Sequence, residues 1–577
     1  MKHEAFYESG VYSAPEMHIY AGWVAHPGSF AARQVFFNEE KDIALIFSGE
    51  CFAGDETYAA LKAKGHRLDE SGNDWLVHFY EEKGDQFFEK LNGPFTGLLI
   101  DKKQNRAFLF NDRYGTERIY WHESDEGTYF ASEAKALLLI LPKLRAFDDV
   151  GVAQYLALGC TIDERTLFRG IQMLAGASVW TFEKNRIYRG RYFSPHIWES
   201  QSILPADSFE LEFQKTLKRV VARYFSSNST LGISLTGGLD SRMIMASRPD
   251  GNGRMACYTF AGRTGETLDA QMAAQVASGC GLAHQVLRID EDFLSNFKAH
   301  ADRSVYVTDG YFGVLGAHEI YLSRKARHLA PLRLTGVFGG EILRGVSTFK
   351  PLQLSPELLS SDFRHNMDDV VLRRDKISPV SFAAFKEIPW HIFGSLAACR
   401  SQLTVRTPYL DNELVALAYR APKSFRDSSL PALRFVTNND PVLGEIPTDM
   451  GERLEASAIM RVSSCLFSKL TCKLDYYNSE GLPGSLSSFD PLLRVASSKL
   501  GILERHKYLT YTRWFRKELA TYLTSALRDR DIDETPYWNT DFVKRMAERH
   551  ISGTKNYTRE INAVLTLGAV KRLLFKL

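Results

Sequence analysis

The stretch Ile233-Ser234-Leu235-Thr236-Gly237-Gly238-Leu239-Asp240-Ser241-Arg242 decides the fold. Residues 231–235 have the length and apolar character of a buried strand, and residues 243–246 suit a helix packed behind the turn. Gly237 and Gly238 let backbone N–H groups approach an anion closely, and the start of the helix adds partial positive charge. The turn therefore predicts a polyphosphate site, with Asp240 as a carboxylate that holds Mg²⁺ between phosphate oxygens.

A simpler interpretation of the same turn is structural. A Gly-Gly-x-Asp-Ser turn caps a helix when Asp240 or Ser241 serves as the N-cap residue. The glycine-rich pattern that ends in Gly-Lys-Ser/Thr is absent, which argues against an ordinary phosphoryl-transferring P-loop. The turn alone leaves the phosphate site and the helix cap open.

Composition limits the classes of protein that remain. The 577 residues exceed what one core organises, so two or more domains are expected. The 71 basic and 69 acidic residues give a net charge of +2, so we expect neither nucleic acid nor a membrane as partner. No apolar run resembles a signal peptide or a membrane span, which predicts a cytoplasmic protein. The scattered cysteines suggest neither disulfides nor a zinc site; they are Cys51, Cys160, Cys257, Cys280, Cys399, Cys465 and Cys472.

Periodicity divides the chain into two parts, 1–205 and 206–577. The first part has the alternation of strands at 43–47, 95–101 and 107–111, a helix at 75–80, and a proline-containing linker over 191–205. The second part opens with a helix for which Ser208 is the predicted N-cap, with Phe209, Phe213, Leu217 and Val220 at helical spacing. It then alternates strands (231–235, 255–260, 285–289, 332–334) with helices such as 268–279. This order predicts a parallel, doubly wound sheet that binds its ligand at the carboxyl ends of the strands.

Several motifs resemble one family along nearly the whole chain. Thr236 to Ser241 resembles the Ser-Gly-Gly-Leu-Asp-Ser loop of ATP pyrophosphatases, and of asparagine synthetases in particular. Residues 91–101 with 111–115 resemble the glutaminase half of asparagine synthetases, and residues 335–345 and 405–411 resemble two later signatures. Residues 550–557 with 565–567 resemble the closing helices of that family, and the tail from Arg453 is expected to be largely helical. The implied fold class is an α+β N-terminal nucleophile-type sandwich followed by an α/β ATP pyrophosphatase domain with a parallel sheet.

The resemblance also implies a set of site residues, with ATP and Mg²⁺ as cofactors. Asp240 would be the catalytic residue and a metal ligand. Glu341 would be a second metal ligand, or else an acid stabilised by the dipole at a helix N-terminus. Gly262 would lie beside the adenine, and Thr335 and Gly336 would contact the nucleotide through the backbone. The nucleotide loop would comprise Leu235, Thr236, Gly237, Gly238, Leu239, Asp240 and Ser241.

The sequence departs from the family at the synthetase site. Val337 stands where the family has a catalytic Glu, and Gly340 stands where it has the aspartate that helps to hold magnesium. Leu430 takes the place of the lysine that neutralises pyrophosphate. Arg406 in the motif Val405 to Asp411 is either a ligand clamp or a buried structural arginine paired with Asp411.

The glutaminase half departs more severely. The family attacks glutamine with a cysteine that is the first residue after Met removal, whereas Lys2 stands here and the first cysteine is Cys51. Ser48-Gly49-Glu50 replaces Asn-Gly-Glu and loses an amide that would donate to the oxyanion. The acidic residue expected to hold the glutamine amine falls near Gly72-Asn73. We therefore expect a structural domain without glutaminase activity.

Two functions of different classes follow from these residues. One is an AMP-forming amide ligase that adenylates a small-molecule or peptide carboxylate and joins it to ammonia or a substrate amine. β-Lactam synthetases and lasso peptide cyclases, which lack the nucleophilic cysteine, resemble this case because they use an internal amine. The other is a catalytically silent homologue that acts as a nucleotide-binding scaffold or regulator. A homodimer is compatible with either function.

Overall fold

The structure is a computed structural model. It describes residues 1–30, 32, 35–68, 73–227, 229–249, 255–263, 267–368, 370, 372, 377–454, 470–475 and 508–576. Three predicted features lie wholly or partly outside these residues: Gly72, Cys465, and much of the tail that follows Arg453.

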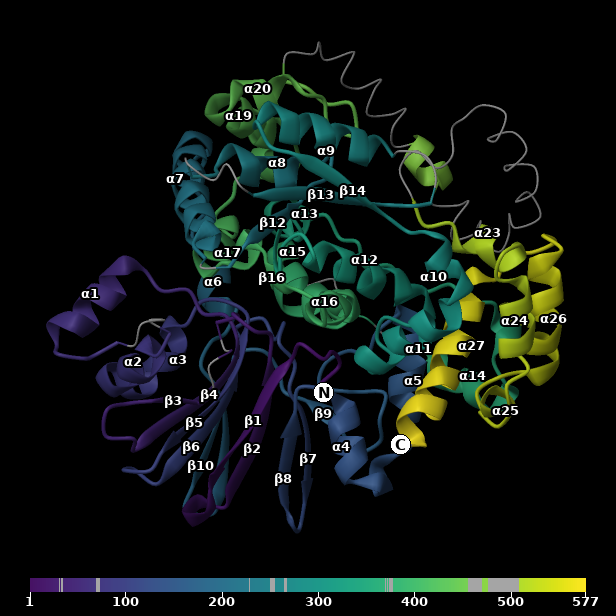
Figure 1. The fold of residues 1–577 in the computed structure, drawn as a ribbon, viewed down its shortest axis with the longest axis horizontal. Helices are drawn as coiled ribbons and strands as arrows, with labels where there is room; N and C mark the ends of the chain where they lie inside the picture. The colour runs from purple at the N-terminus through teal and green to yellow at the C-terminus, as the bar shows by residue number, and fades with distance from the viewer. Residues whose placement is uncertain are drawn as a thin grey trace.

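The N-terminal part is built on antiparallel sheets, as Figure 1 shows. Among the described residues, six strands pair in the order β11-β10-β6-β5-β4-β3, beside the pair β1-β2 and the sheet β8-β7-β9. The predicted strands at 43–47, 95–101 and 107–111 are confirmed as β4, β5 and β6. The strands are β1 (Glu8–Ala14), β2 (Ile19–Ala25), β3 (Val35–Phe37), β4 (Ile43–Gly49), β5 (Phe95–Asp101), β6 (Arg106–Asn111), β7 (Tyr120–Ser124), β8 (Gly127–Ala131), β9 (Gln172–Met173), β10 (Ser178–Glu183) and β11 (Arg186–Arg191).

Helices flank these sheets and extend the core toward the C-terminal part. The predicted helix at 75–80 is confirmed as α2, whose buried Trp75, Leu76 and Tyr80 pack with β4 and β5 in one apolar cluster. Helices α4 and α5 instead share a core with helices near the C-terminus, so apolar packing is continuous between the two parts. These helices are α1 (Asp55–Ala63), α2 (Trp75–Lys83), α3 (Phe87–Lys90), α4 (Ala134–Ile140) and α5 (Asp149–Leu158).

The C-terminal part contains the predicted parallel sheet. Its order is β14-β13-β12-β15-β16, and every described pairing in it is parallel. The chain runs from β12 outward to β14 and then returns to place β15 on the other side of β12. In such a sheet the ligand crevice lies at the carboxyl ends of β12 and β15, where the strand order reverses. The strands are β12 (Leu231–Ser234), β13 (Ala256–Ala261), β14 (His284–Arg288), β15 (Leu332–Thr335) and β16 (Thr404–Arg406).

Both faces of the parallel sheet are covered, as near-continuous apolar strands require. Neighbouring residues on β13 show this, because Cys257 packs in one apolar cluster and Tyr258 in another. The covering helices lie around the sheet in Figure 1. They include α7 (Ala206–Phe225), α8 (Leu239–Ala246), α9 (Leu268–Gly279), α10 (Glu291–Ser295), α11 (Phe297–Val307), α12 (Ala317–Arg327), α13 (Gly339–Arg344), α16 (Phe393–Arg400), α17 (Asn412–Ala418), α19 (Leu430–Asn439) and α20 (Pro441–Glu445).

Two predicted boundaries are wrong in detail. Helix α7 begins at Ala206 with Pro205 as N-cap, so Ser208 lies inside the first turn. Proline is pre-organised to start a helix, which explains the earlier start. The linker 191–205 contains a short helix, α6 (His196–Glu199), whose Trp198 is buried. The four apolar residues predicted along α7 are all buried.

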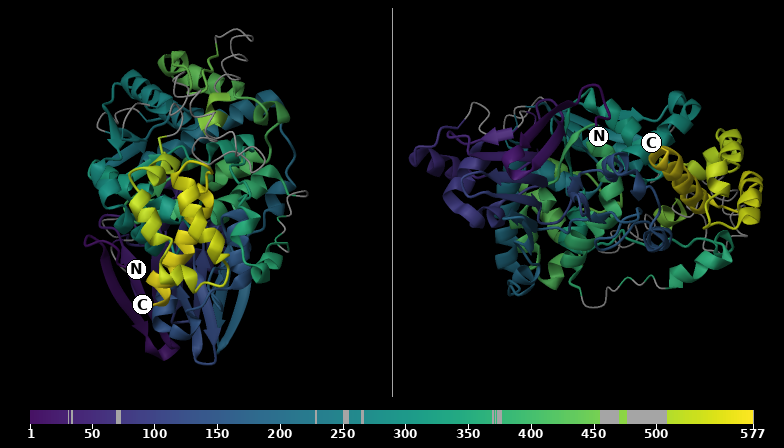
Figure 2. Two further views of the ribbon diagram at one scale, coloured as in Figure 1. Left: turned by 90° about the vertical axis from the view of Figure 1, so that its right-hand side faces the viewer. Right: turned by 90° about the horizontal axis from the view of Figure 1, so that it is seen from below.

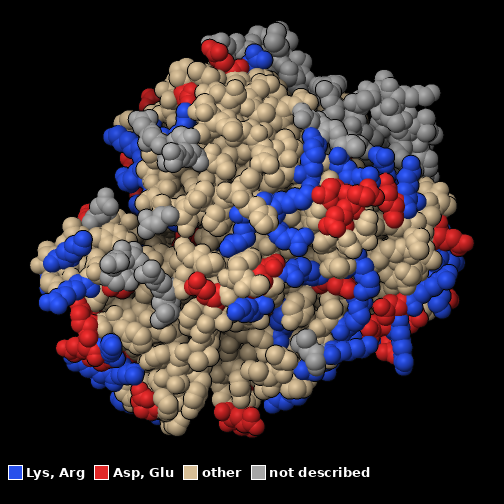
Figure 3. Space-filling view, viewed as in Figure 1, with Lys and Arg blue, Asp and Glu red and all other residues tan. Residues whose placement is uncertain are grey.

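Helices close the described end of the chain, as predicted for the part of the tail that can be seen. They stand together on one side of the molecule in Figure 2. Their bounds are α23 (Tyr511–Arg516), α24 (Ala520–Ala526), α25 (Arg530–Asp533), α26 (Thr540–Ile551) and α27 (Thr558–Val570). Among the described residues, no helix combines the length and apolarity needed to cross a membrane. Basic and acidic side chains intermix on the face in Figure 3, in keeping with the small net charge.

A buried ion pair joins the two parts of the chain. Arg406 donates from Nε and Nη2 to the two carboxylate oxygens of Glu50, at 2.9 and 2.8 Å. Its Nη1 donates to the carbonyl oxygens of Tyr224 and Ser226. Arg406 is thus a structural arginine, but its predicted partner is wrong, because Asp411 pairs with Arg223 at 2.8 Å. The planar guanidinium suits such a two-point tie.

Replacing Arg406 with Ala should destabilise the protein by about 3–5 kcal/mol, because it leaves the Glu50 carboxylate buried without a partner. The double variant Glu50→Leu with Arg406→Met should lose much less, since it removes both charges. Thermal unfolding followed by circular dichroism checks both expectations. Lys298→Ala, which breaks the exposed pair with Asp302, is the matched control and should change stability by less than about 1 kcal/mol. If the Arg406→Ala protein were as stable as this control, the stabilising role of the Glu50–Arg406 ion pair would be contradicted.

Candidate functional site

The glycine turn joins β12 to α8 at the edge of the sheet where the strand order reverses. Helix α8 begins at Leu239, directly after Gly238 as N-cap, and Asp240 and Ser241 lie in its first turn. No side chain caps this helix, so the interpretation of Asp240 or Ser241 as the N-cap is wrong. The side chains of Leu235 and Leu239 are buried, so these two residues can offer a ligand only their backbone.

A second loop, after β15, lies directly against the first. A Cβ on Gly336 would stand 2.5 Å from the Ser241 nitrogen, and one on Gly339 would stand 2.5 Å from the Asp240 Cγ. Only glycine allows this approach. Between them, Phe338 is buried with φ +79°, in the left-handed region. A non-glycine residue held there costs about 1–3 kcal/mol, which places backbone strain at the junction of the two loops.

Asp240 is paired with an arginine that sequence reasoning missed. Arg344 Nη2 lies 3.0 Å from Asp240 Oδ1 and donates to Oδ2 at 3.1 Å. A Cβ on Gly340 would lie only 3.2 Å from the same nitrogen, so the lost aspartate leaves room for the guanidinium. Burial raises the pKa of Asp240, while Arg344 opposes that rise. The Tyr409 hydroxyl donates to the Asp240 carbonyl at 2.7 Å and fixes the first turn of α8.

The two predicted magnesium ligands lie in the first turns of α8 and α13. Asp240 is engaged by Arg344. Glu341 lies in the first turn of α13, and burial together with the nearby Asp240 charge raises its pKa to about 7. The site therefore presents an arginine at Asp240 where a divalent cation was expected.

A second acid that the sequence did not single out occupies the phosphate cradle. Gly237 N–H donates to Asp269 Oδ1 at 2.5 Å, and Asp269 lies in the first turn of α9. Burial, reinforced by the charge of Asp449, raises the pKa of Asp269 to about 6. The N–H group predicted for a phosphate thus holds a carboxylate. In the sequence, Asp269 resembles an ordinary acid at the start of a helix. The only indication of its role was that this helix follows β13, whose carboxyl end lies beside that of β12.

The rest of the loop is held by its own neighbours. Thr236 N–H donates to the Ser241 hydroxyl at 3.3 Å, and Gly238 N–H donates to the Thr236 hydroxyl at 3.4 Å. Arg242, fully buried, donates to carbonyl oxygens of the loop and of the segment after α20, including Gly237 and Pro447. An added Cβ on Gly238 would meet only the Thr236 hydroxyl, at 3.5 Å. The loop is therefore rigidly backed and open at Gly238.

The remaining predicted residues surround this junction unevenly. Thr335 ends β15 opposite Ser234 of β12, and its hydroxyl accepts from Val337 N–H at 3.3 Å. Gly262 follows β13, where a Cβ would stand 2.6 Å from the Tyr508 carbonyl oxygen. Val337 and Leu430 are partly exposed, at 39% and 36%. The structure thus brings together the glycine loop, Thr335, Gly336 and Glu341, and places Gly262 at the end of the adjacent strand.

The glutaminase half holds no reactive thiol among its described residues. Cys51 and Cys160 are its two cysteines, and burial raises the pKa of each to about 12. Reactive thiols need a lowered pKa and access, so both are structural. Glu50, in the loop that replaces Asn-Gly-Glu, is held by Arg406.

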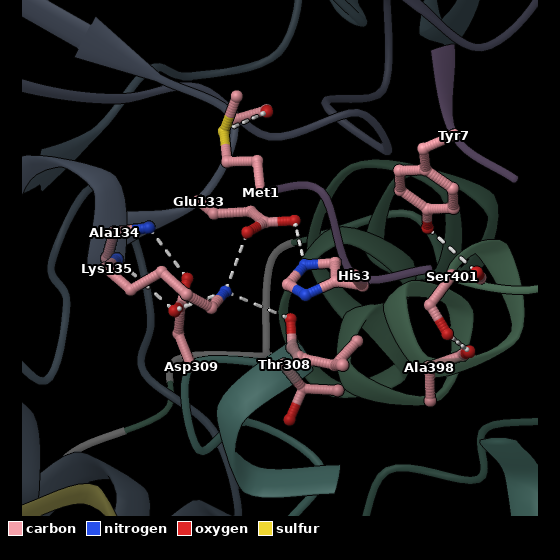
Figure 4. Close-up of polar contacts among 12 residues, drawn as sticks. Met1, His3, Tyr7, Glu133, Ala134, Lys135, Thr308, Asp309, Ala398 and Ser401 are labelled. Atoms are coloured by element: carbon pink, nitrogen blue, oxygen red, sulfur yellow. Dashed lines mark hydrogen bonds and ion pairs between the residues drawn. The ribbon is translucent and has the colours of Figure 1, made fainter. Parts of the chain in front are cut away.

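The first residues of the chain are anchored by an ionic network at the contact between the two parts, drawn in Figure 4. His3 Nε2 lies 2.7 Å from Glu133 Oε1, and Lys135 Nζ lies between Glu133 and Asp309, at 2.8 and 3.0 Å. Asp309 also accepts from the Ala134 N–H at 2.7 Å. These contacts fasten the segment near Lys2 to α4 and to the end of α11.

The comparisons with known proteins match two separate stretches of the chain. Residues 27–193 match the family described as glutamine amidotransferase domain, and residues 212–384 match asparagine synthase. The chain is 29% identical over 208 residues to glutamine-hydrolyzing asparagine synthetase 3 of Bacillus subtilis, covering 35% of this chain and 33% of the relative. It is 25% identical over 356 residues to asparagine synthetase 2 of the same organism, covering 55% and 44%. Both parts of the chain thus resemble glutamine-hydrolyzing asparagine synthetases.

The matches are partial in length. The aligned region spans between a third and just over half of the first relatives, reaching 56% of a putative asparagine synthetase of Mycobacterium bovis at 24% identity. Among solved structures, a glutamine phosphoribosylpyrophosphate amidotransferase from B. subtilis covers 46% of this chain and 50% of its own, at 13% identity and a TM-score of 0.22. That score is too low to support an argument about this chain. The N-terminal sandwich and the parallel sheet thus rest on the observed topology and on the two family matches.

Asp269→Asn should stabilise the protein at pH 7.5 by about 2–3 kcal/mol. The folded-state pKa of about 6 lies above the value of 3.8 for the unfolded chain, so the ionised carboxylate opposes folding above pH 6. The gain should shrink as the pH falls from 6 toward 4, because Asp269 is then protonated in the folded protein. Thermal unfolding at pH 4.5, 6 and 7.5 measures this. Asp292→Asn, an exposed first-turn acid of α10, is the control, and a loss of stability in Asp269→Asn at pH 7.5 would contradict the assignment.

Proposed function

We propose that this chain is an ATP-dependent, AMP-forming amide ligase that draws its nitrogen from ammonia or a substrate amine. One observation carries the proposal: Arg344 is fixed by Asp240 beside the glycine loop, and its Nη1, although buried, makes no hydrogen bond to any described residue. A buried guanidinium with an unpaired N–H is costly unless a ligand completes it. Next to a helix N-terminus and two glycines, that ligand is an anion such as a nucleotide phosphate.

The proposed reaction has two steps. A carboxylate oxygen of the substrate attacks the α-phosphorus of ATP, forming an acyl-adenylate and releasing pyrophosphate. The amine then attacks the acyl carbon, and AMP leaves as the amide forms. In this scheme Gly237 and Gly238 N–H groups bind phosphate oxygens once Asp269 has moved away. Arg344 stabilises the charge that develops on the phosphate, and Asp240 is its positioning residue.

Arg344→Ala should lower kcat/KM for ATP by about 100-fold or more, the loss typical when one fixed donor to a developing charge is removed. Arg344→Lys should recover only part of it, because a lysine lacks the planar fork. The assay is pyrophosphate release from ATP across a panel of carboxylates and amines. Arg186→Ala, at the exposed start of β11, is the matched control and should retain full activity. Equal rates in Arg344→Ala and the control would contradict the proposal.

The silent homologue remains the second candidate, and one contact favours it: Asp269 occupies the Gly237 N–H. A scaffold whose phosphate cradle is permanently filled would bind nucleotide weakly or not at all. Isothermal titration with ATP separates the two candidates. No turnover across the panel, with ATP binding that is indifferent to Asp240→Asn and Arg344→Ala, would favour the scaffold. Turnover that falls together with affinity in both variants would favour the ligase.

We also propose that the N-terminal half releases no ammonia from glutamine. Its two cysteines are buried thiols with raised pKa values, and Lys2 cannot act as the acyl-transfer nucleophile. The purified protein should use ammonium salts or an amine but not glutamine as donor. Ammonia release is measured by a coupled glutamate dehydrogenase assay. Release above the buffer rate that disappears in Cys51→Ser would overturn this expectation.

A further inference from the structure

A cluster of histidines and carboxylates lies in the N-terminal half, away from the glycine loop. Glu39 follows β3, His66 follows α1, and His78 and Glu81 lie one turn apart on α2. Figure 1 shows β3, α1 and α2 together at the lower left, at the edge of the antiparallel sheet, whereas α8 and α9 lie near the top of the molecule. The ligase mechanism uses none of these side chains.

One donor atom from each of the four side chains converges on a common point. These atoms all lie within 4.8 Å of one another. His78 Nδ1 is 3.0 Å from Glu81 Oε2 and 3.5 Å from Glu39 Oε2, and His66 Nδ1 is 3.7 Å from Glu81 Oε2. A tetrahedral zinc ion with bonds of about 2.0–2.1 Å places its ligands about 3.3 Å apart. These three separations lie near that value, and all of the donor atoms lie within 4.8 Å of one another.

The second oxygen of each carboxylate is held by another group. Glu39 Oε1 accepts from the Arg67 N–H at 3.1 Å. Glu81 Oε1 accepts from the Asn38 side-chain amide at 2.9 Å. Each carboxylate therefore keeps one oxygen turned toward the shared point. Such outer contacts fix ligating carboxylates in metal sites.

The second nitrogen of each histidine faces a further carboxylate. His66 Nε2 lies 3.0 Å from Glu82 Oε1, and His78 Nε2 lies 3.8 Å from Asp74 Oδ2. A carboxylate behind a histidine sets which nitrogen carries the proton and which binds metal, and it raises the basicity of the ligand. Both rings thus present Nδ1 to the shared point, with the geometry that a metal-binding imidazole needs.

Burial and charge favour a dication at this point. The His78 side chain is 2% exposed and that of Glu39 is 44% exposed, so the cluster is buried at His78 and reaches solvent at Glu39. Carboxylates of Asp74, Glu39 and Glu81 lie within 4 Å of the His78 ring nitrogens. Their negative charge attracts a divalent cation, and two imidazoles with two carboxylates suit zinc better than magnesium or calcium.

We propose that Glu39, His66, His78 and Glu81 form a closed, tetrahedral Zn²⁺ site. Four protein ligands leave no open position, which is the pattern of structural rather than catalytic zinc. The ion would link the segment after α1 and the turn after β3 to α2. Three separate segments supply these ligands, and they are also joined by an apolar cluster that includes Phe36, Leu61 and Trp75 and by the ion pair of Lys64 with Glu82.

Zinc titration of the full chain tests the proposal. Protein stripped with a chelator and desalted at pH 7.5 is titrated with Zn²⁺ against a chromophoric competitor. We expect one tightly bound ion per chain, and at least a 100-fold lower affinity in His66→Ala and in His78→Ala. His196→Ala, which alters a histidine 91% exposed on α6, is the matched control and should bind as the unaltered chain does. Zn²⁺ should raise the melting temperature of the unaltered chain and of the control only.

Two further measurements keep the result interpretable if a histidine variant folds poorly. Glu39→Gln changes the most exposed of the four ligands, and its affinity should fall about 10-fold with folding intact. Co²⁺ bound in place of Zn²⁺ should give the intense visible absorption of tetrahedral coordination, which His66→Ala removes. Less than 0.2 Zn²⁺ per unaltered chain, or equal affinity in the unaltered chain, His66→Ala and Glu39→Gln, would overturn the site.

Discussion

The close approach of two glycine loops is the constraint on which the candidate site depends. Gly336 and Gly339 come so near to the first turn of α8 that any Cβ would overlap its backbone or the Asp240 side chain. This contact buries Asp240 between the loops and raises its pKa. A neighbouring cation offsets the cost of burying a carboxylate. Because Gly340 has no side chain, the Arg344 guanidinium can lie beside Asp240 and provide that positive charge. The missing side chain at Gly340 and the position of Arg344 beside Asp240 thus belong to the same packing arrangement.

Two of the acids around the glycine loop have partners within the protein. Asp240 is met by Arg344, and Asp269 is met by the Gly237 N–H. The raised pKa of Asp269 shows that one N–H does not offset its burial beside Asp449. This acid is therefore the less stable element, and a phosphate that displaces it takes over a donor already aimed at an anion. The two candidate functions differ in whether that displacement occurs.

Local pattern predicted the backbone well. The strand, glycine turn and helix around residues 231–246, and the parallel order of the sheet, follow from apolar runs and spacing that are visible in a single segment. Contacts between distant segments left no such signal. Arg344 is separated from Asp240 by more than a hundred residues, and Glu50 from Arg406 by 356. Asp411 was the wrong partner for Arg406 because closeness in sequence is a poor guide to pairing across a domain contact. The Glu39, His66, His78 and Glu81 cluster was missed for the same reason, since three separate segments supply it.

A crystal structure with α,β-methylene-ATP, a nucleotide that cannot be cleaved to AMP, tests the central claim most directly. The account predicts the triphosphate on the Gly237 and Gly238 N–H groups, with the Asp269 carboxylate displaced. It also predicts Arg344 held by Asp240 and donating from Nη1 to a phosphate oxygen. A structure at millimolar nucleotide in which the Asp269 to Gly237 hydrogen bond persists and no phosphate contacts Arg344 would contradict it.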